Sequence, residues 1–352
     1  MIVAVEGPTL PPDLLWTGRG TAALVALLRE AAPPGSGVLV PVNLCAIAVA
    51  GIIWAGMRPV FHDVSAAHGN AEIAHLEAVD SSDCRFVLAV ANFGRPIDMD
   101  AFCSFAKQRG LILVEDTCNA LGASWNGQPL GSFGDAALYS FNGGKILDVG
   151  HGGAISIRDP ALRGRVAAAI AEMPLADTGH LAAIAELEAT LRVARQAGDE
   201  AAQRGAYARY RPQALFRVDA SWPTRLAPGL DQLEADIARR RLLSARYRAT
   251  IRAPGVTHAP ARQGEAVWRH SLLVPPERRD ALVARLRQIG LSASTWYPPV
   301  NRMFAPESRS LYPEAERFAA RIVNLWVDHS TDEAMVDRTA TIINNFFEQA
   351  TV

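Results

Sequence analysis

The sequence predicts an α/β protein with a mostly parallel, helix-covered sheet, followed by a smaller α/β unit. Two observations lead to this fold class. Up to residue 157, short β-prone runs alternate with helical segments, and several of these runs are apolar throughout, as in strands buried on both faces. Beyond residue 157, alanine- and arginine-rich helical segments precede a second series of strands and helices. We expect a large domain over residues 1–240 and a small domain over 241–352.

The composition is that of a globular intracellular protein. The 352 residues are 49% hydrophobic and 20% charged, which suits a large core. The formal net charge of −1 gives no electrostatic reason to expect nucleic acid or an anionic membrane as a partner. No apolar run reaches the ~20 residues of a membrane span, and the N-terminus lacks a signal-peptide pattern. The four cysteines have no metal-ligand spacing, so we expect reduced thiols and a cytoplasmic protein.

The first element that can be assigned is a helix from Ala22 to Ala32, because residues 1–16 carry no clear pattern. Gly20 and Thr21 lead into this helix, and the free N–H groups of a helix start can bind an anion such as phosphate. An ordinary threonine-capped helix start is the alternative. A strand, a mostly apolar helix and another strand are expected next, at 37–41, 45–56 and 58–63.

The next unit is a buried strand over residues 85–91, followed by an amphipathic helix. Asp98 or Asp100 suits the N-cap of this helix and Gly110 its C-cap. We therefore interpret the two aspartates as capping residues and not as catalytic ones. Further along, Asn126-Gly127 predicts a tight turn between two strands.

Residues that could take part in catalysis follow two of the predicted strands. The apolar run Leu111–Val114 ends in Glu115 and Asp116, and ligands of open α/β sheets bind beyond the carboxyl ends of the strands. A second strand, 136–141, leads to Lys145 in a glycine-flanked loop. An acid and a lysine in these places suit pyridoxal 5'-phosphate. The lysine can form a Schiff base with its aldehyde, and the acid can keep the pyridinium nitrogen protonated.

Other interpretations of these residues stay open at this point. Glu115 and Asp116 could cap a helix or bind a metal ion, although no histidine–carboxylate cluster accompanies them, so no metal site is expected. Lys145 could be a surface lysine in a loop.

Residues 114–154 carry an ordered series of motifs. The series consists of Val114-Glu-Asp-Thr-Cys-Asn-Ala-Leu-Gly-Ala123, Gly127, Gly131-Ser-Phe-Gly-Asp135, Ser140-Phe141, Lys145 and Gly152-Gly153-Ala154. It resembles the DegT/DnrJ/EryC1/StrS aminotransferases. Two earlier stretches are similar to the same family, namely Gly20-Thr-Ala-Ala23 and Gly94-Arg-Pro-Ile-Asp-Met-Asp100. Each piece alone would be weak evidence, and the ordered series is specific.

The resemblance implies a pyridoxal-phosphate-dependent enzyme of fold type I. By position, Lys145 would bind the cofactor and move the proton, Asp116 would pair with the ring nitrogen, and Asn119 would lie beside the ring. The cofactor phosphate would be held by Gly20, Thr21, Ala22 and Ser140. Relatives transfer an amino group, mostly from L-glutamate, to a keto sugar attached to a nucleotide. A homodimer with its sites at the interface is also implied.

Three positions depart from the family pattern. Cys45 stands where relatives carry an aromatic residue against the cofactor ring, and a thiol offers less stacking surface. Leu215 replaces an asparagine that reaches the partner's cofactor phosphate, and Trp296 replaces a histidine near the substrate. We expect reduced cofactor affinity or another ring in place of the lost one, and we interpret Trp54 as a core residue. The phosphate motif also comes earlier in the chain than in relatives, which suggests an atypical substrate.

The second half of the chain contains mostly helical patterns. Residues 160–210 predict one or two long surface helices that could contact a partner subunit, and 230–252 predicts a helix that joins the domains. The small domain should contain strands at 267–274 and 291–297 and helices at 277–289, 313–323 and 332–349. Candidate substrate residues, by family position, are Arg217, His270, Trp296 and Tyr297. A surface arginine and a core histidine are the alternatives for the first two.

Amination of a nucleotide-linked keto sugar is the first expectation for function. The next is amination of an aminocyclitol precursor or another keto intermediate of secondary metabolism. A third is a regulatory or assembly subunit that binds the cofactor weakly, given the departures at Cys45 and Leu215. Elimination of a hydroxyl is disfavoured, because the sugar dehydratase among the relatives has histidine where this chain has Lys145.

Overall fold

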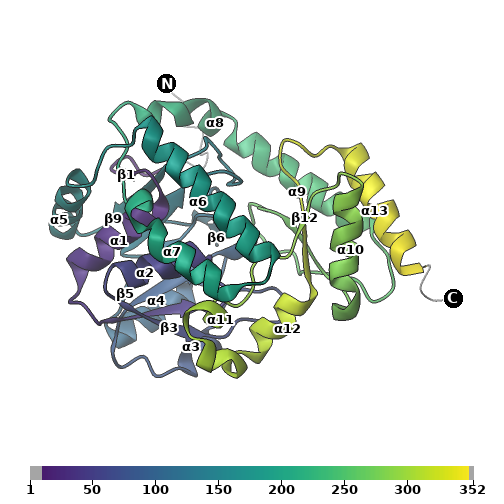
Figure 1. The fold of residues 1–352 in the computed structure, drawn as a ribbon, viewed down its shortest axis with the longest axis horizontal. Helices are drawn as coiled ribbons and strands as arrows, with labels where there is room; N and C mark the ends of the chain where they lie inside the picture. Colours follow the sequence, from purple (N-terminus) through teal and green to yellow (C-terminus); the bar gives the residue numbers. More distant parts are fainter. Residues whose placement is uncertain (1–9, 349–352) are drawn as a thin grey trace.

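The computed structural model describes residues 10–348, which form a large body and a smaller one (Figure 1). The large body contains a seven-stranded sheet in the order β1-β9-β8-β5-β4-β2-β3. The pairs among β2, β3, β4, β5 and β8 are parallel, whereas β9 is antiparallel to β8 and β1. The predicted mostly parallel sheet is therefore confirmed. Its strands are β1 (Leu15–Thr17), β2 (Gly37–Pro41), β3 (Arg58–His62), β4 (Cys84–Val90), β5 (Ile112–Asp116), β8 (Ala136–Ser140) and β9 (Gly153–Ile157).

Helices cover both faces of this sheet because its central strands are apolar on both sides. In β4, Phe86 and Leu88 lie in one hydrophobic cluster and Val87 in the other, which is the period of two expected of a strand. One face is covered by α1 (Gly20–Ala31), α2 (Ala46–Trp54), α5 (Pro160–Ala171), α6 (Thr178–Gln196) and α7 (Glu200–Ala214). The other is covered by α3 (Ile73–Glu77), α4 (Met99–Arg109) and the start of α9 (Leu233–Thr250). Among residues 10–348, no helix is long and apolar enough to cross a membrane.

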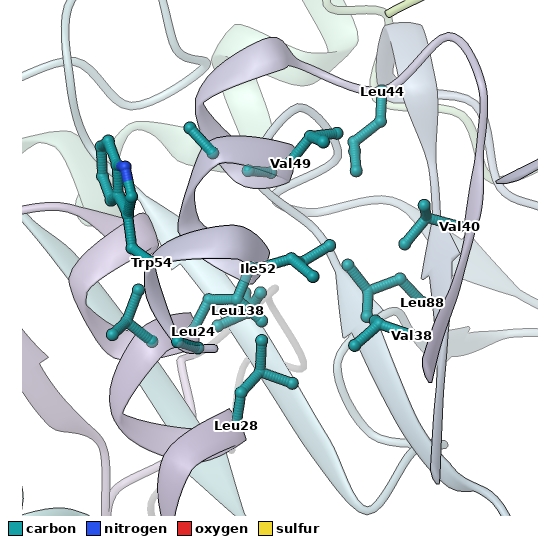
Figure 2. Close-up of a cluster of buried hydrophobic side chains, with 14 of the residues drawn as sticks. Leu24, Leu28, Val38, Val40, Leu44, Val49, Ile52, Trp54, Leu88 and Leu138 are labelled. Atoms are coloured by element: carbon teal, nitrogen blue, oxygen red, sulfur yellow. The ribbon is translucent and has the colours of Figure 1, made fainter. Parts of the chain in front are cut away.

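The core between α1, α2 and the sheet fixes the start of α1 relative to the strands. Figure 2 shows side chains of both helices directed at the sheet, and Leu24 and Leu28 from α1 and Ile52 from α2 belong to the same cluster as Val38 of β2. Trp54 is 8% exposed and belongs to the same cluster, so its prediction as a core residue is confirmed.

The predicted caps of α4 and the predicted turn are also confirmed. The Asp98 carboxylate accepts a hydrogen bond from the Ala101 N–H at 3.0 Å, and Gly110 ends the helix in the left-handed region, with a φ of 62°. Asn126 and Gly127, both with positive φ, connect β6 (Ser124–Trp125) to β7 (Gln128–Pro129). The remaining short elements of this body are η1 (Asn92–Gly94), η2 (Trp222–Leu226) and α8 (Ala227–Asp231).

The segment 160–210 differs from its prediction, because it contains the three helices α5, α6 and α7 and not one or two. The break before α7 is made by Asp199, whose carboxylate accepts the Ala202 N–H at 2.8 Å. Ala206 and Tyr210 are almost fully buried. These helices therefore contribute to the core and are not only a surface layer.

The smaller body is built on an antiparallel sheet in the order β10-β11-β13-β12, joined to the large body by α9 (Figure 1). Its elements are β10 (Thr257–His258), β11 (His270–Leu273), α10 (Pro276–Gln288), β12 (Ala293–Ser294), β13 (Ile322–Leu325) and α13 (Glu333–Glu348). The helix predicted to continue to residue 323 was wrong at its end. Ile322–Leu325 forms a strand there because it pairs with both β11 and β12, a long-range contact that periodicity does not reveal. Residue 349, the last of the predicted final helix, lies outside the described residues.

One stretch of the C-terminal part packs back onto the large body. It contains α11 (Asn301–Phe304), η3 (Pro306–Leu311) and α12 (Pro313–Arg321). The Val300 N–H donates to the Val42 carbonyl at 2.7 Å, and the N–H groups of Glu314 and Ala315 donate to the Asp63 carboxylate at 3.0 and 2.8 Å. The division into 1–240 and 241–352 stays a prediction. Residues beyond 240 nevertheless contribute to the large core.

His62, at the end of β3, is fully buried. Its Nδ1 lies 2.8 Å from the Asp63 carbonyl oxygen, to which the neutral ring donates, and its Nε2 is buried without a partner among the described residues. Burial lowers the pKa of His62 from its ordinary value to about 4. The folded protein therefore keeps this ring neutral where the unfolded chain takes up a proton.

We predict that His62 makes the fold less stable as the pH falls from 6.5 towards 4. Because only the unfolded chain binds the proton in this window, His62 should lower the free energy of unfolding by about 2 kcal/mol between pH 7 and pH 5. Urea unfolding of the wild type and of His62→Asn at pH 7, 6 and 5 measures the effect. Parallel pH profiles for the two proteins would contradict it.

Candidate active site

The site lies where β5 and its parallel neighbour β8 end. Asp116 is opposite Leu138 in their register, so both carboxyl ends reach the same edge of the sheet. Successive residues of a strand face opposite sides, and this separates the two adjacent acids, Glu115 and Asp116. The pair predicted from the sequence therefore divides into two different roles.

Glu115 holds the loop that leads into β8. Its carboxylate accepts three backbone hydrogen bonds, each 2.7 Å long, from Gly131, Phe133 and Gly134. Burial raises the pKa of Glu115, and these hydrogen bonds oppose the rise. With its oxygens committed to backbone N–H groups, Glu115 is a structural residue. In the described part of the chain, no group of three or more histidine, cysteine, aspartate or glutamate side chains is placed to hold a metal ion.

Asp116 faces the turn that carries Cys118 and Asn119. Its carboxylate accepts the Cys118 N–H at 3.0 Å. Burial raises the pKa of the Cys118 thiol well above its ordinary value. The charge of Asp116 adds to this rise and the charge of Lys145 opposes it. Asp116 and Lys145 therefore both lie within electrostatic reach of one buried thiol, as expected if they share a site.

Lys145 is held in place by its loop and by one side chain. The backbone N–H of Lys145 donates to the Asn142 carbonyl at 3.2 Å. The carbonyl of the preceding Gly144 accepts the indole N–H of Trp268 at 2.7 Å. The Lys145 ammonium donates to Asn119 Oδ1 at 2.9 Å. The lysine is thus directed toward the turn after β5 and is not a free surface side chain.

Asn119 connects this lysine to the C-terminal part of the chain. Its Nδ2 donates to the Tyr297 hydroxyl oxygen at 2.8 Å. The Tyr297 ring lies nearly parallel to that of Trp268, at 11° and with 6.0 Å between centroids. Burial raises the pKa of Tyr297 well above its ordinary value, so the phenol stays neutral. It accepts from Asn119 and keeps its own proton to donate.

The start of α1 forms an anion cradle beside these residues. No side-chain cap closes the helix, which begins at Gly20. A Cβ on Gly20 would stand 3.0 Å from the Tyr139 carbonyl oxygen and 3.7 Å from Ser140 Cβ, so a side chain there would crowd the end of β8. The Ser140 hydroxyl accepts from Asn142 at 2.9 Å, which leaves its own proton for an anion. Thr21 and Ala22 follow in the first turn, both buried.

Cys45 occupies the N-cap position of α2 without a side-chain cap hydrogen bond and is half-buried. Its electrostatic interaction with Tyr297 and Cys118 adds to the raised pKa values of these two groups, for which burial is the largest cause. Cys45 therefore lies in the surroundings of the Asp116–Lys145 pair, where the family pattern has an aromatic ring.

The other sequence-predicted substrate residues are not joined to Lys145 by direct contacts. His270 is buried in the small body, with Nδ1 2.8 Å from Ser244 Oγ and Nε2 3.0 Å from the His258 ring. This agrees with the alternative of a core histidine. Arg217 donates to the Met173 carbonyl at 3.1 Å. Trp296 packs on Tyr297 and lies beneath the Arg195 guanidinium, 5.3 Å from it. All three stay predictions as substrate residues.

Trp268 and Arg269 lie against the loop that carries Lys145. From the sequence, their neighbour His270 was instead the candidate substrate residue. The triplet Trp268-Arg269-His270 was visible in the sequence, but the strand β11 begins only at His270. Trp268 and Arg269 therefore lie before the regular strand, where the alternation of side chains does not assign their directions. Val267, with a φ of 51°, marks the irregular backbone just before them.

Together these features define a class of protein. A lysine and an acid at the carboxyl edge of a mostly parallel sheet, beside an open helix start, are the parts of a fold-type I pyridoxal-phosphate enzyme. The sequence model of the DegT/DnrJ/EryC1/StrS aminotransferase family matches residues 15–344, and the chain belongs to that family. It is a pyridoxal-phosphate-dependent aminotransferase.

Two relatives match nearly the whole chain. A UDP-N-acetyl-3-dehydro-alpha-D-glucosamine 3-aminotransferase of Acidithiobacillus ferrooxidans is 28% identical over 332 residues, which cover 92% of this chain and 81% of that protein. A dTDP-4-dehydro-2,3,6-trideoxy-D-glucose 4-aminotransferase of Saccharopolyspora spinosa is 28% identical over 339 residues, covering 94% and 83%. The crystal structure of the aminotransferase TlmJ from Streptoalloteichus hindustanus shares the fold, with a TM-score of 0.79 and 23% identity over 96% of this chain and 87% of that one.

The residues present fit the cofactor. The uncapped helix start with Gly20, together with the Ser140 hydroxyl, provides donors for a phosphate. The buried Asp116 provides an acceptor for a protonated ring nitrogen, and Lys145 provides the amine.

We predict that Lys145→Ala loses the visible absorption of the lysine-bound cofactor and all transaminase activity, because no other residue in the site supplies an amine. The free energy of unfolding should change by about 1 kcal/mol or less, since one hydrogen bond is lost from a half-buried side chain. Absorption spectroscopy and urea unfolding of the purified variant test both statements.

The chain offers a matched control, because its one other lysine is Lys107, exposed on α4. Lys107→Ala should keep both the absorption and the activity. A Lys145→Ala enzyme that stays yellow, or a Lys107→Ala enzyme that turns colourless, would contradict the assignment.

Proposed function

We propose that this aminotransferase moves the amino group of L-glutamate to a keto sugar attached to a nucleotide. The observation that carries the proposal is the activity named for the two relatives that match nearly the whole chain, each an aminotransferase for a dehydro sugar linked to UDP or dTDP. The retention of Lys145 and Asp116 at the sheet edge supports it. Glutamate as donor is supported by the resemblance to the family.

When bound, pyridoxal 5'-phosphate supplies the aldehyde that receives the amino group and the ring that draws off electrons. Lys145 Nζ then acts as base and acid, taking the proton from the carbon that loses its amino group and returning one to the carbon that gains it. Asn119 Oδ1, 2.9 Å from this nitrogen, orients it.

The other residues bind and orient. Asp116 would accept a hydrogen bond from the ring nitrogen in a buried site, where a charge pair is stronger than in water. Gly20, Thr21 and Ser140 would donate to the phosphate, and Ala22, whose N–H donates to the Arg19 carbonyl at 2.9 Å, would lie beside it. The neutral hydroxyl of Tyr297 can donate to an oxygen of the ring or of the substrate. We propose that Arg217, His270 and Trp296 contact a large substrate at a greater distance from Lys145.

We further propose a homodimer that works in the cytoplasm. The family resemblance supports the dimer, and the four free cysteines are in keeping with a reducing compartment. With Leu215 in place of the family's asparagine, the cross-dimer phosphate contact would be absent here, so the phosphate would depend more on residues of the same subunit.

We predict that the purified holoenzyme loses its visible band on addition of L-glutamate and forms 2-oxoglutarate. The band should return on addition of a nucleotide-linked keto sugar, with formation of the amino sugar, and not with the cyclitol ketone scyllo-inosose. Rapid-mixing absorption spectroscopy and mass spectrometry of the products measure the donor half-reaction and the acceptor half-reaction.

Each alternative has its own outcome in this experiment. Recovery of the band only with scyllo-inosose would replace the keto sugar by an aminocyclitol precursor. No donor-dependent change with any amino acid would indicate a subunit without catalysis and overturn the proposed function.

A further inference from the structure

The phosphate of the cofactor needs more positive charge than its assigned residues supply. A phosphate ester carries about 1.5 to 2 negative charges at neutral pH. Gly20 and Thr21 offer backbone N–H groups and Ser140 offers a hydroxyl, while a helix start adds only about half a positive charge. Lys145 would be occupied by the aldehyde. The start of α1 therefore calls for a full cation nearby.

Arg19 is the residue directly before Gly20, at the N-cap position of α1. Its carbonyl accepts the Ala22 N–H at 2.9 Å, and its backbone pairs with Gly152 in a parallel bridge. A Cβ on Gly153 would stand 2.3 Å from the Arg19 carbonyl carbon, so the start of β9 packs tightly against this backbone. The main chain of Arg19 is therefore fixed beside the anion cradle.

The Arg19 side chain is mostly buried and has only a weak ionic partner. It is 13% exposed, and its guanidinium carbon lies 5.5 Å from the Tyr210 ring. Its Nη2 donates to Glu188 Oε1 at 3.0 Å, but the Glu188 side chain is 50% exposed, and ion pairs with exposed carboxylates contribute little. The Tyr210 hydroxyl donates to the same oxygen at 3.3 Å. A largely buried cation with one shared, solvated acceptor has capacity for a second anion.

The charge of Arg19 acts beyond Glu188. Burial lowers the pKa of His151, which lies just before β9, and the charges of Arg225 and Arg19 lower it further. Burial is also the main cause of the raised pKa of Tyr207 on α7, and the charge of Arg19 opposes that rise. The guanidinium thus lies within electrostatic range of α7 and of the segment between the lysine and β9.

We propose that Arg19 binds the phosphate of pyridoxal 5'-phosphate through guanidinium N–H groups that Glu188 does not use. A guanidinium has five N–H donors in a rigid plane, so it can bind two anions at once. The phosphate then receives uncharged donors from Gly20, Thr21 and Ser140 and a full positive charge from Arg19. This role does not depend on the identity of the amino donor or of the keto acceptor.

The test compares the cofactor with pyridoxal, the same aldehyde without the phosphate. In full-length Arg19→Gln apoenzyme, the dissociation constant for pyridoxal 5'-phosphate should rise about 10- to 100-fold, as expected when a charge-assisted hydrogen bond is lost. For pyridoxal it should change less than about threefold, because the contact was never made. Arg19→Lys, which keeps the charge but not the fork, should lie between the wild type and Arg19→Gln. Titration of the visible absorption band measures each constant.

Arg225 provides a matched control. It is an exposed arginine of η2 whose charge also acts on His151. Arg225→Gln removes the same charge from these surroundings without altering the start of α1. Its dissociation constant for pyridoxal 5'-phosphate should therefore stay within about threefold of the wild-type value.

The ionisation of the bound phosphate gives a readout independent of affinity. A phosphate ester has its second pKa at about 6 in water, and a neighbouring cation lowers it. Phosphorus-31 NMR of the holoenzymes from pH 5 to 8 should therefore give a higher phosphate pKa in Arg19→Gln than in the wild type or Arg225→Gln.

Three outcomes would overturn the role of Arg19. The first is an equal loss of affinity for pyridoxal 5'-phosphate and pyridoxal, which would indicate a general disturbance of the site. The second is no loss for either compound, or a phosphate that titrates alike in wild type and Arg19→Gln. The third is an equal loss in Arg225→Gln, which would attribute the effect to net charge alone.

Discussion

The amide of Asn119 is the contact on which the site depends. One end accepts from the Lys145 ammonium and the other donates to the Tyr297 hydroxyl. These partners come from distant parts of the sequence, so the amide sets the position of the lysine relative to the C-terminal part of the chain. Trp268 adds a second link, because it binds the Gly144 carbonyl and stacks on Tyr297. The lysine is therefore fixed through its own side chain and through the backbone just before it, as general acid–base catalysis at a single nitrogen requires.

The sheet explains why such a site forms where it does. Parallel pairing brings the ends of β5 and β8 to one edge of the sheet. Because successive side chains of a strand face opposite sides, the adjacent acids Glu115 and Asp116 have different roles. Glu115 uses its charge on three backbone N–H groups of the loop into β8, while Asp116 stays on the side of the lysine. The start of α1 is brought to the same edge by the packing of α1 and α2 on the sheet (Figure 2). Fold and site thus follow from the same alternation of apolar residues.

The sequence alone was sufficient where the signal is local. The strand over 37–41, the caps Asp98 and Gly110 and the Asn126–Gly127 turn were all predicted, because periodicity and turn chemistry depend on neighbouring residues. Two predictions failed for different reasons. Ile322–Leu325 became a strand only through long-range pairing with β11 and β12. Residues 160–210 divided into three helices that enter the core, with Asp199 as the N-cap of α7. Within the site, the lysine and the acid came from motif order, whereas the bridge from Asn119 to Tyr297 joins residues 178 positions apart and has no sequence signature.

Reductive trapping of the cofactor tests the central claim most directly, because the chain has only two lysine side chains, 107 and 145, that can form an imine. Borohydride would convert the bond between lysine and pyridoxal phosphate into a stable secondary amine, and peptide mass mapping would locate it. The account predicts one modified peptide, with the added group on Lys145 and none on Lys107. A label on Lys107, or a cofactor released unreduced from a holoenzyme that is active, would contradict it.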